Sequence, residues 1–246
     1  MRKRFDNQTI VVTGATRGIG KAIAAQLLRE GATVIGTGTR QSNERAEGIG
    51  ELEGVHWHDV DLSSVQEAES FCSFLAKLER IDACINNAGI NRIKVLDDIT
   101  AADYDVVHSV NQRAPFLICQ AVAGRMRACG GGRILNVASI WSEVSKAQRS
   151  LYSASKTALV GMTRALSAEL GSDGILINSL SPGFVLTDLT RESLSEEQMC
   201  ELADQVPLKR LATPEEIAEV ACFLVSDSNR YLTGQNIIAD GGFTIV

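Results

Sequence analysis

Three side chains in one stretch of the sequence could together catalyse proton transfer. Tyr152 lies thirteen residues after Ser139, and Lys156 lies four residues further on. Four residues make about one turn of an α-helix, so the Tyr152 phenol and the Lys156 ammonium are expected on one helix face. The Ser139 hydroxyl could then hydrogen-bond a substrate oxygen. These residues and their spacing predict an acid–base site.

The tyrosine of such a site needs help, because its pKa in water is about 10. Lowering that pKa to about 7 takes about 4 kcal/mol of bias toward the phenolate. A lysine charge about 4 Å away supplies roughly this amount at an effective dielectric constant of about 20, but only about 1 kcal/mol in bulk water. The pair is therefore expected to be partly dehydrated. The same spacing also arises by chance on solvated helices.

Strands and helices alternate along the chain around this stretch. Strands are predicted at residues 9–13, 33–35, 55–60, 83–86, 133–138, 175–180 and 236–239. Helices are predicted from residue 19, within 41–52, at 63–79, at 100–128 with an interruption near 111–115, around Tyr152, and from about 214. This order predicts an α/β fold, a doubly wound parallel sheet with helices on both faces. No Pro-, Gly- or Ser-rich linker divides the chain, so residues 1–246 are expected to form one domain.

Composition narrows the classes of function. The chain has 246 residues, a net charge of -6 and six scattered cysteines without a Cys-x-x-Cys pair. Buried reduced thiols are therefore expected rather than metal ligands. The negative charge disfavours nucleic acid and anionic membranes as partners. No apolar run has membrane-spanning length and the start lacks a signal-peptide core, so a cytoplasmic location is expected.

A glycine-rich loop at residues 13–20, Thr-Gly-Ala-Thr-Arg-Gly-Ile-Gly, joins the first strand to the first helix. At this place in a doubly wound sheet, backbone amides and a helix N-terminus can bind a phosphate. Three residues separate the first two glycines, which differs from the Gly-x-Gly-x-x-Gly fingerprint. In its strand–turn–helix context the loop predicts dinucleotide binding.

The end of the second strand indicates which dinucleotide is bound. An acid there normally accepts a hydrogen bond from the adenosine ribose of NAD, but residues 37–40 read Thr-Gly-Thr-Arg. Arg40, and Arg17 in the glycine loop, could instead bind a 2′-phosphate. The sequence therefore favours NADP(H) over NAD(H). The alternative is that both arginines are merely solvated.

The glycine loop, Asn-Asn-Ala-Gly at 86–89, Asn111, Ser139 and the Tyr-x-x-x-Lys of 152–156 occur in an order and spacing that resemble the short-chain dehydrogenase/reductase family. The resemblance covers essentially the whole chain. Within the family, the likeness is greatest to bacterial 3-oxoacyl-(acyl-carrier-protein) reductases. It implies a Rossmann-type fold with a seven-stranded parallel sheet, and usually a homotetramer.

The resemblance also implies the role of each residue. Tyr152 would be the acid/base, and Ser139 would orient the substrate oxygen. Lys156 would lower the tyrosine pKa and hold the nicotinamide ribose. Asn111 would lie at a helix irregularity and support a water relay to Lys156. The implied reaction is hydride transfer from NADPH to a ketone carbon, or the reverse oxidation of an alcohol.

The cofactor and substrate residues follow from the same resemblance. The predicted cofactor-binding residues are Gly14, Thr16, Arg17, Gly18, Ile19, Gly20, Thr39, Arg40, Asp61, Leu62, Asn87, Ala88, Gly89, Tyr152, Lys156, Pro182, Gly183, Val185 and Thr187. The predicted substrate residues are Ile140, Trp141, Arg149 and Phe184. Residues 188–206 would form a lid over the substrate.

The sequence departs from carrier-protein reductases where these offer basic residues to their acidic partner. The two places read Cys-Gly-Gly-Gly at 129–132 and Gly-Ser-Asp-Gly at 171–174. Arg125, Arg127 and Arg133 lie nearby and could compensate. An acyl carrier protein therefore remains a possible partner, with weakened support.

The segment between Ser139 and Tyr152 is unusually polar for a wall against an acyl chain. Trp141, Lys146 and Arg149 could bind a hydroxylated or anionic substrate, or the two cations could face solvent or an oligomer contact. The first expectation is reduction of a 3-oxoacyl thioester, and the alternative is a sugar or other small polar hydroxy compound. A noncatalytic dinucleotide sensor or scaffold is the alternative from a different class.

Overall fold

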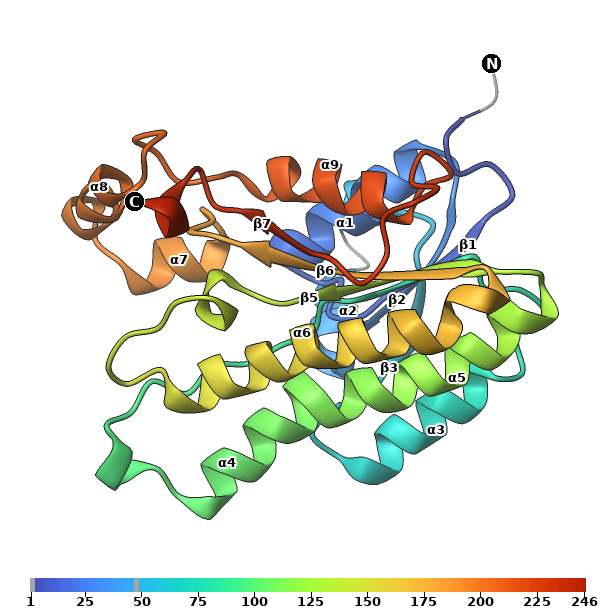
Figure 1. Ribbon diagram of the computed structural model, residues 1–246, viewed down its shortest axis with the longest axis horizontal. Coiled ribbons are helices and arrows are strands. Elements are labelled where there is room, and N and C mark those ends of the chain that lie inside the picture. Colours follow the sequence, from blue (N-terminus) through green and yellow to red (C-terminus); the bar gives the residue numbers. More distant parts are fainter. Residues whose placement is uncertain (1–2, 47–48) are drawn as a thin grey trace.

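The computed structural model describes residues 3–46 and 49–246. One seven-stranded parallel sheet, in the order β3-β2-β1-β4-β5-β6-β7, runs through the molecule (Figure 1). Its strands are β1 (Thr9–Val12), β2 (Thr33–Gly38), β3 (His56–Asp59), β4 (Ala83–Asn86), β5 (Gly132–Val137), β6 (Ile175–Pro182) and β7 (Asn236–Ala239). The α-helices are α1 (Gly18–Arg29), α2 (Arg40–Ala46), α3 (Val65–Leu75), α4 (Ala101–His108), α5 (Ala114–Ala128), α6 (Ser150–Leu170), α7 (Asp188–Ser193), α8 (Glu196–Gln205) and α9 (Pro214–Val225). The predicted Rossmann-type doubly wound fold is confirmed.

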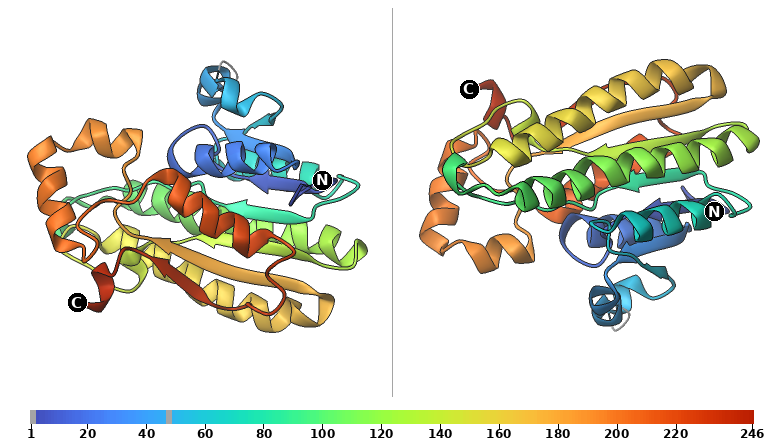
Figure 2. Two further views of the ribbon diagram at one scale, coloured as in Figure 1. Left: turned by 90° about the horizontal axis from the view of Figure 1, so that it is seen from above. Right: turned by 90° about the horizontal axis from the view of Figure 1, so that it is seen from below.

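Alternation along the strands gives the sheet an apolar layer on each face. In β1, Ile10 and Val12 pack with helices α1 and α9, whereas Val11 packs with α3 and α5 on the other face. Because successive strand residues point to opposite sides, one apolar run supplies both layers. Helices α1 and α9 lie together on one face, and α3, α5 and α6 lie on the other (Figure 2).

The neighbouring strands β1 and β4 mark the point where the strand order reverses. Strands β2 and β3 extend the sheet on one side of β1, and β4 to β7 extend it on the other. The connections after β1 and β4 therefore leave in opposite directions and open a crevice at the carboxyl ends of the strands, where doubly wound sheets bind ligands. Both the glycine loop and the Asn-Asn-Ala-Gly run of residues 86–89 begin at this crevice.

The predicted interruption of the helix near residues 111–115 is a π-helical segment, Ser109–Arg113, between α4 and α5. Pro115 stands in the first turn of α5 and has no N–H to donate back to the preceding turn. A π-turn accommodates one more residue than an α-helical turn, so α4 and α5 continue as one helical rod. It carries the buried Asn111 toward the catalytic helix.

Segment 188–206, predicted to be a lid, consists of the short helices α7 and α8 beyond the carboxyl end of β6 (Figure 1). Thr187 and Ser195 cap them, since each side chain accepts a hydrogen bond from the backbone N–H three residues on. Over residues 3–46 and 49–246, no helix has the length and apolarity needed to cross a bilayer.

Candidate active site

A cleft of about 600 Å³ lies at the crevice between β1 and β4. Its lining includes thirteen of the predicted cofactor residues: Gly14, Thr16, Arg17, Gly18, Ile19, Gly20, Thr39, Asp61, Leu62, Asn87, Ala88, Gly89 and Thr187. The lining residues that sequence reasoning missed are Thr37, Gly38, Ser42, Val60, Ile90, Val110 and Asp188. Most of the missed residues directly adjoin predicted ones, so a wider window around each motif would have included them.

The floor of the cleft is held by bonds between the two crossing loops. The Asn87 side-chain amide donates to the backbone oxygens of Thr13 and Gly14, both at 3.0 Å. In return, the Thr13 hydroxyl accepts from the backbone N–H groups of Asn87 and Ala88 at 3.0 Å. A Cβ added at Gly20 would collide with the Gly14 carbonyl and with the Asn87 amide. Glycine is required there because the backbone itself forms the wall.

The N-terminus of α1 opens into this cleft. Gly14 and Gly18 have φ values of 64° and 54°, in the left-handed region that favours glycine. Arg17, at the N-cap, makes no side-chain cap bond, so the first helical N–H groups remain available. Amides and helix dipole together suit a phosphate group. The loop therefore fits the pyrophosphate of a dinucleotide.

The two arginines predicted to select NADP(H) have different surroundings. Arg17 lines the cleft, together with the hydroxyl-bearing Thr39 and Ser42. Arg40 is absent from the lining, its side chain is 82 % exposed, and its Nε lies 3.2 Å from Glu44 on the next turn of α2. Arg40 therefore does not line the cleft in this structure, and its contact with the cofactor stays a prediction. Its partner one helical turn away attracts it along the helix surface instead.

The catalytic candidates Ser139, Tyr152 and Lys156 meet where β5 ends and α6 begins. Ser139 is buried directly after β5, and its hydroxyl accepts a bond from the Trp141 N–H at 3.3 Å. Lys156 is 3 % exposed, and its ammonium lies 5.7 Å from the centre of the Tyr152 ring. A Cβ added at Gly89 would lie 3.2 Å from that ammonium, which places the lysine at the inner end of the cofactor cleft.

Burial controls the ionisation of this pair. It lowers the pKa of Lys156 to about 8 and raises the pKa of Tyr152. For Tyr152, a hydrogen bond with Ser139 and the charge of Arg149 act in the opposite direction and lower the pKa. The Lys156 ammonium donates to the Val137 carbonyl at 2.8 Å. This bond holds Lys156 at the end of β5, and its effect on the tyrosine pKa stays a prediction.

Asn111 ties the active-site loop to the catalytic helix. Its side-chain amide donates to the Ile90 carbonyl at 2.9 Å and to the Ser155 hydroxyl at 3.0 Å, and its carbonyl oxygen accepts from the Ile90 N–H at 2.9 Å. Ser155 precedes Lys156 in the chain. Asn111 thus joins the Ile90 backbone to the Ser155 side chain next to the lysine, and its participation in a water relay stays a prediction.

Residues 182–187 follow β6 and lead to a contact with the glycine loop. Gly183 packs against Asp240, where a Cβ would lie 2.7 Å from the Asp240 Cα. Val185 pairs with Ala212, and the Thr187 side chain lies against Gly18. Of the predicted residues in this segment, Thr187 reaches the cleft, while Pro182, Gly183 and Val185 are absent from its lining.

An aromatic and cationic wall flanks the catalytic residues on the substrate side. Trp141 lies edge to face with Phe184, with ring centres 6.3 Å apart, and Phe184 packs likewise on Phe243 at 5.0 Å. The charged ends of Lys146 and Arg149 lie 5.6 and 5.7 Å from the Trp141 ring centre. Ile140 is 1 % exposed and belongs to the protein interior. Lys146, which the sequence indicated as able to bind a polar substrate, thus stacks on the same ring as Arg149.

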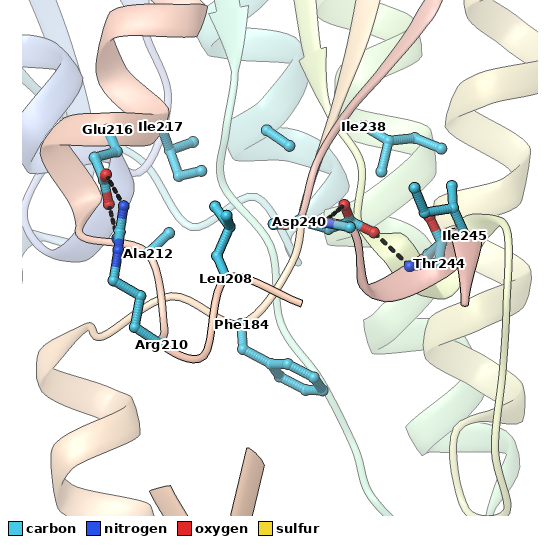
Figure 3. Close-up of a pocket in the computed structure, with 13 residues that line it drawn as sticks. Phe184, Leu208, Arg210, Ala212, Glu216, Ile217, Ile238, Asp240, Thr244 and Ile245 are labelled. Atoms are coloured by element: carbon cyan, nitrogen blue, oxygen red, sulfur yellow. Dashed lines mark hydrogen bonds and ion pairs between the residues drawn. The ribbon is translucent and has the colours of Figure 1, made fainter. Parts of the chain in front are cut away.

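A second cavity of about 480 Å³ lies beyond Phe184, between the start of α9, β7 and the C-terminal segment (Figure 3). The Arg210–Glu216 ion pair borders it on one side, and Asp240, bonded to the N–H groups of Gly242 and Thr244, borders it on the other. Its lining is mostly apolar and includes none of the predicted catalytic residues. The two cavities are therefore separate parts of the surface.

The cysteines do not contribute a metal site. All six are free thiols, and burial raises the pKa of Cys84 and Cys119. Cys129 and Cys200 are exposed, so the expectation of uniformly buried thiols is wrong for these two. Within the part of the chain that the structure describes, no group of His, Cys, Asp and Glu is arranged to hold a metal ion.

Comparisons with known proteins agree with this geometry. Residues 14–244 match the family model for enoyl-(acyl carrier protein) reductase. The chain is 37 % identical to the 3-oxoacyl-(acyl-carrier-protein) reductase FabG of Aquifex aeolicus, over 98 % of this chain and 99 % of the relative. It is 36 % identical to the D-threitol dehydrogenase of Mycolicibacterium smegmatis, over 98 % and 95 % of the two chains.

A crystal structure from Beutenbergia cavernae superposes with a TM-score of 0.91 and 34 % identity over 98 % of both chains. It is described as a proposed NAD(P)-dependent gluconate 5-dehydrogenase with NADP bound at low occupancy. The similar proteins thus include enzymes named for acyl substrates and for sugar-derived ones.

Proposed function

Because this chain belongs to the short-chain dehydrogenase/reductase family of oxidoreductases, we propose that it interconverts a ketone and a secondary alcohol with NADP(H). The observation that carries the proposal is that Ser139 hydrogen-bonds Tyr152 while the Lys156 ammonium lies near the Tyr152 ring and beside the cleft residue Gly89. A proton donor, an oxygen-orienting hydroxyl and a buried cation are there within reach of one substrate carbonyl.

In the proposed mechanism, NADPH supplies the hydride when bound, and the protein controls position and proton transfer. Ser139 donates a hydrogen bond to the substrate oxygen, and Tyr152 gives its proton to the alkoxide as charge develops. Lys156, whose pKa is about 8, is mostly protonated near pH 7 and stabilises the resulting phenolate. Asn111 is a positioning residue that bonds the hydroxyl of Ser155, the residue before the lysine.

NADP(H) is proposed in preference to NAD(H). Arg17, Thr39 and Ser42 offer one guanidinium and two hydroxyls to the cleft, and residues 37–40 at the end of β2 include no carboxylate that could accept a bond from the ribose of NAD. The glycine loop that would hold the pyrophosphate is too tight for any Cβ at Gly20. The residues present therefore fit this cofactor.

The remaining expectations about the whole molecule are retained as part of this proposal. We propose that residues 1–246 act as one NAD(P)-binding domain, that α7 and α8 form the lid over the substrate, and that the protein is a cytoplasmic homotetramer. The one continuous sheet and the position of α7 next to the cleft residue Thr187 support the domain and the lid.

The proposed substrate is a small polar hydroxy or keto compound rather than a carrier-bound 3-oxoacyl thioester, although the acyl substrate was the first expectation from sequence. Arg127 pairs with Asp173 at 2.6 Å, and Arg125 donates to a backbone carbonyl at 2.7 Å. Arg133 bonds the Asn229 carbonyl and pairs with Asp227. The arginines that could have compensated for the missing carrier-binding cations are thus engaged within the chain. The relatives named for threitol and gluconate agree with the polar alternative.

A noncatalytic sensor or scaffold has less support, because all four predicted catalytic residues are present and three of them converge. The test measures NADPH oxidation with acetoacetyl thioesters and with a panel of keto sugars, for the wild type and for Tyr152→Phe. The proposal predicts turnover on at least one ketone, a loss of at least about a thousandfold in Tyr152→Phe, and unchanged NADPH binding. Tight NADPH binding with no turnover of any ketone would favour the sensor.

A further inference from the structure

We propose that the substrate carries an oxyanion group, a carboxylate or a phosphate, which binds the guanidinium of Arg149 beside Tyr152. The inference rests on the proposed function of this site and adds the chemical class of the substrate. Three features of the substrate-side wall carry it: the lack of a partner for Arg149, the second cation on the same ring, and the backbone conformation that presents them.

Arg149 lies next to the reacting group. It precedes α6 directly and stands three residues before Tyr152. The two side chains are close enough that each favours the charged form of the other, so that the pKa of Tyr152 is lowered by Arg149. A substrate held by this guanidinium would therefore have its carbonyl near the phenol.

Arg149 is partly buried but bonded to no acceptor. Burial lowers its pKa, and across residues 3–46 and 49–246 its side chain forms no ion pair and donates no hydrogen bond. Some other arginines have acidic partners, since Arg127 pairs with Asp173 and Arg210 pairs with Glu216, both at 2.6 Å. A guanidinium has five N–H donors, and partial removal from water makes unpaired donors costly. An oxyanion from the substrate would satisfy them.

Lys146 brings a second positive charge to the same place. Both its ammonium and the Arg149 guanidinium lie over the Trp141 ring, at 5.6 and 5.7 Å from the ring centre. Stacking on an aromatic face holds each cation in position, but two like charges near one ring repel each other, and no acid pairs with either among the described residues. A bound anion converts that repulsion into attraction.

The backbone is shaped to present these cations. Gln148 has a φ of 69°, in the left-handed region that favours glycine, and it immediately precedes Arg149. A non-glycine residue held there is typical of ligand sites, where surrounding contacts enforce the conformation. Trp141 lies two residues after Ser139 and is supported from behind by Phe184. The cationic platform is thus fixed relative to the catalytic serine.

The test compares three six-carbon ligands that differ at one terminal group: D-gluconate with a carboxylate, D-sorbitol with a neutral hydroxyl, and D-sorbitol 6-phosphate. Their dissociation constants are measured by calorimetry on the enzyme saturated with NADPH, with which an alcohol cannot react. We expect at least one anion to bind at least tenfold more tightly than D-sorbitol. Preference for D-gluconate identifies a carboxylate, and preference for the phosphate ester identifies a phosphate.

Variants assign the preference to Arg149. Arg149→Met should abolish the advantage of the anion while leaving D-sorbitol binding within about threefold, and Arg149→Lys should retain part of it. Arg164→Met, which removes an exposed charge from the same helix, is the matched control and should keep the full preference. Equal binding of all three ligands, failure of both anions to bind at millimolar concentration, or a preference that survives Arg149→Met would each overturn the inference.

The same titration in Tyr152→Phe separates this inference from the proposed function. Anion preference that persists in this variant supports the oxyanion site whatever the turnover. Absence of NADPH oxidation on every ketone, with the preference intact, would count against the proposed reaction alone.

Discussion

Lys156 of α6 donates a 2.8 Å hydrogen bond to the carbonyl of Val137, the last residue of β5 and two positions before Ser139. One buried bond therefore joins the catalytic helix to the strand that carries the catalytic serine. The same ammonium lies 5.7 Å from the centre of the Tyr152 ring. A cofactor ribose placed beside Gly89 would lie against the same ammonium.

Burial of Lys156 predicts a particular dependence of stability on pH. Its pKa falls from 10.5 to about 8, so the folded state pays about 3 kcal/mol to keep it charged below pH 8. As pH rises from 8 to 10.5, the unfolded state binds more protons than the folded state, and the wild type gains stability from this group. We expect Lys156→Met to lack this gain. Melting temperatures of the two proteins at pH 7 to 10 measure it.

The melting temperature of the wild type should therefore rise relative to that of Lys156→Met between pH 7 and 10. The loss of activity in the variant does not affect this comparison. A difference that stays constant from pH 7 to 10 would show that the lysine keeps its ordinary pKa.

The two arginines near the ribose site should differ in their effect on the cofactor. Arg17 lines the cleft and Arg40 pairs with Glu44, so Arg17→Gln should raise the KM for NADPH about tenfold, a loss of about 1.4 kcal/mol. Arg40→Gln should change it less than about threefold, because an exposed ion pair contributes little. Initial rates with NADPH and NADH give both values. Equal effects of the two variants would contradict the assignment.

Two glycines provide a matched test of the cofactor loop. A Cβ at Gly20 collides with the Gly14 carbonyl, whereas a Cβ at the exposed Gly171 meets no atom within 4 Å. Gly171 also has helical dihedral angles that alanine adopts easily. Gly20→Ala should weaken NADPH binding by at least about tenfold through displacement of the loop, and Gly171→Ala should leave it unchanged. Fluorescence titration with NADPH measures both, and normal binding in Gly20→Ala would exclude the close approach described here.

Asn111 should act on turnover rather than on ground-state binding. Asn111→Ala removes the bonds to Ile90 and Ser155, so the backbone next to Lys156 loses its support. We expect kcat to fall by about 10- to 100-fold with the KM for NADPH within about threefold, and the pH profile of kcat to shift. A stability loss without any change in the pH profile would assign Asn111 a purely structural role.

The sheet and its two apolar layers could be predicted from the sequence, because the local pattern of apolar residues determines both. Thus Ile10, Val11 and Val12 divide between opposite faces as a buried parallel strand requires. Ser139, Tyr152 and Lys156 were predicted to be catalytic from their spacing together with the family resemblance, and this role stays a prediction.

Other features depend on long-range or side-chain geometry that spacing does not encode. Arg40 pairs with Glu44, and Lys156 bonds the Val137 carbonyl. Both contacts depend on side-chain rotamers that are set by tertiary packing. The stacking of Lys146 and Arg149 on Trp141 likewise needs the loop conformation set at Gln148. A polar segment could be recognised in the sequence, but its geometry could not.

The central claim, that this site moves a hydride to a carbonyl carbon and a proton from Tyr152, is tested most directly with deuterium-labelled NADPH. The ketone most rapidly reduced in the substrate panel is incubated with [4-²H]NADPH of each stereochemistry, and the product alcohol is analysed by mass spectrometry and NMR. The account predicts one deuterium on the carbinol carbon from one of the two cofactors, and at least about a thousandfold slower formation with Tyr152→Phe. Product without deuterium from either cofactor, or an undiminished rate in Tyr152→Phe, would contradict it.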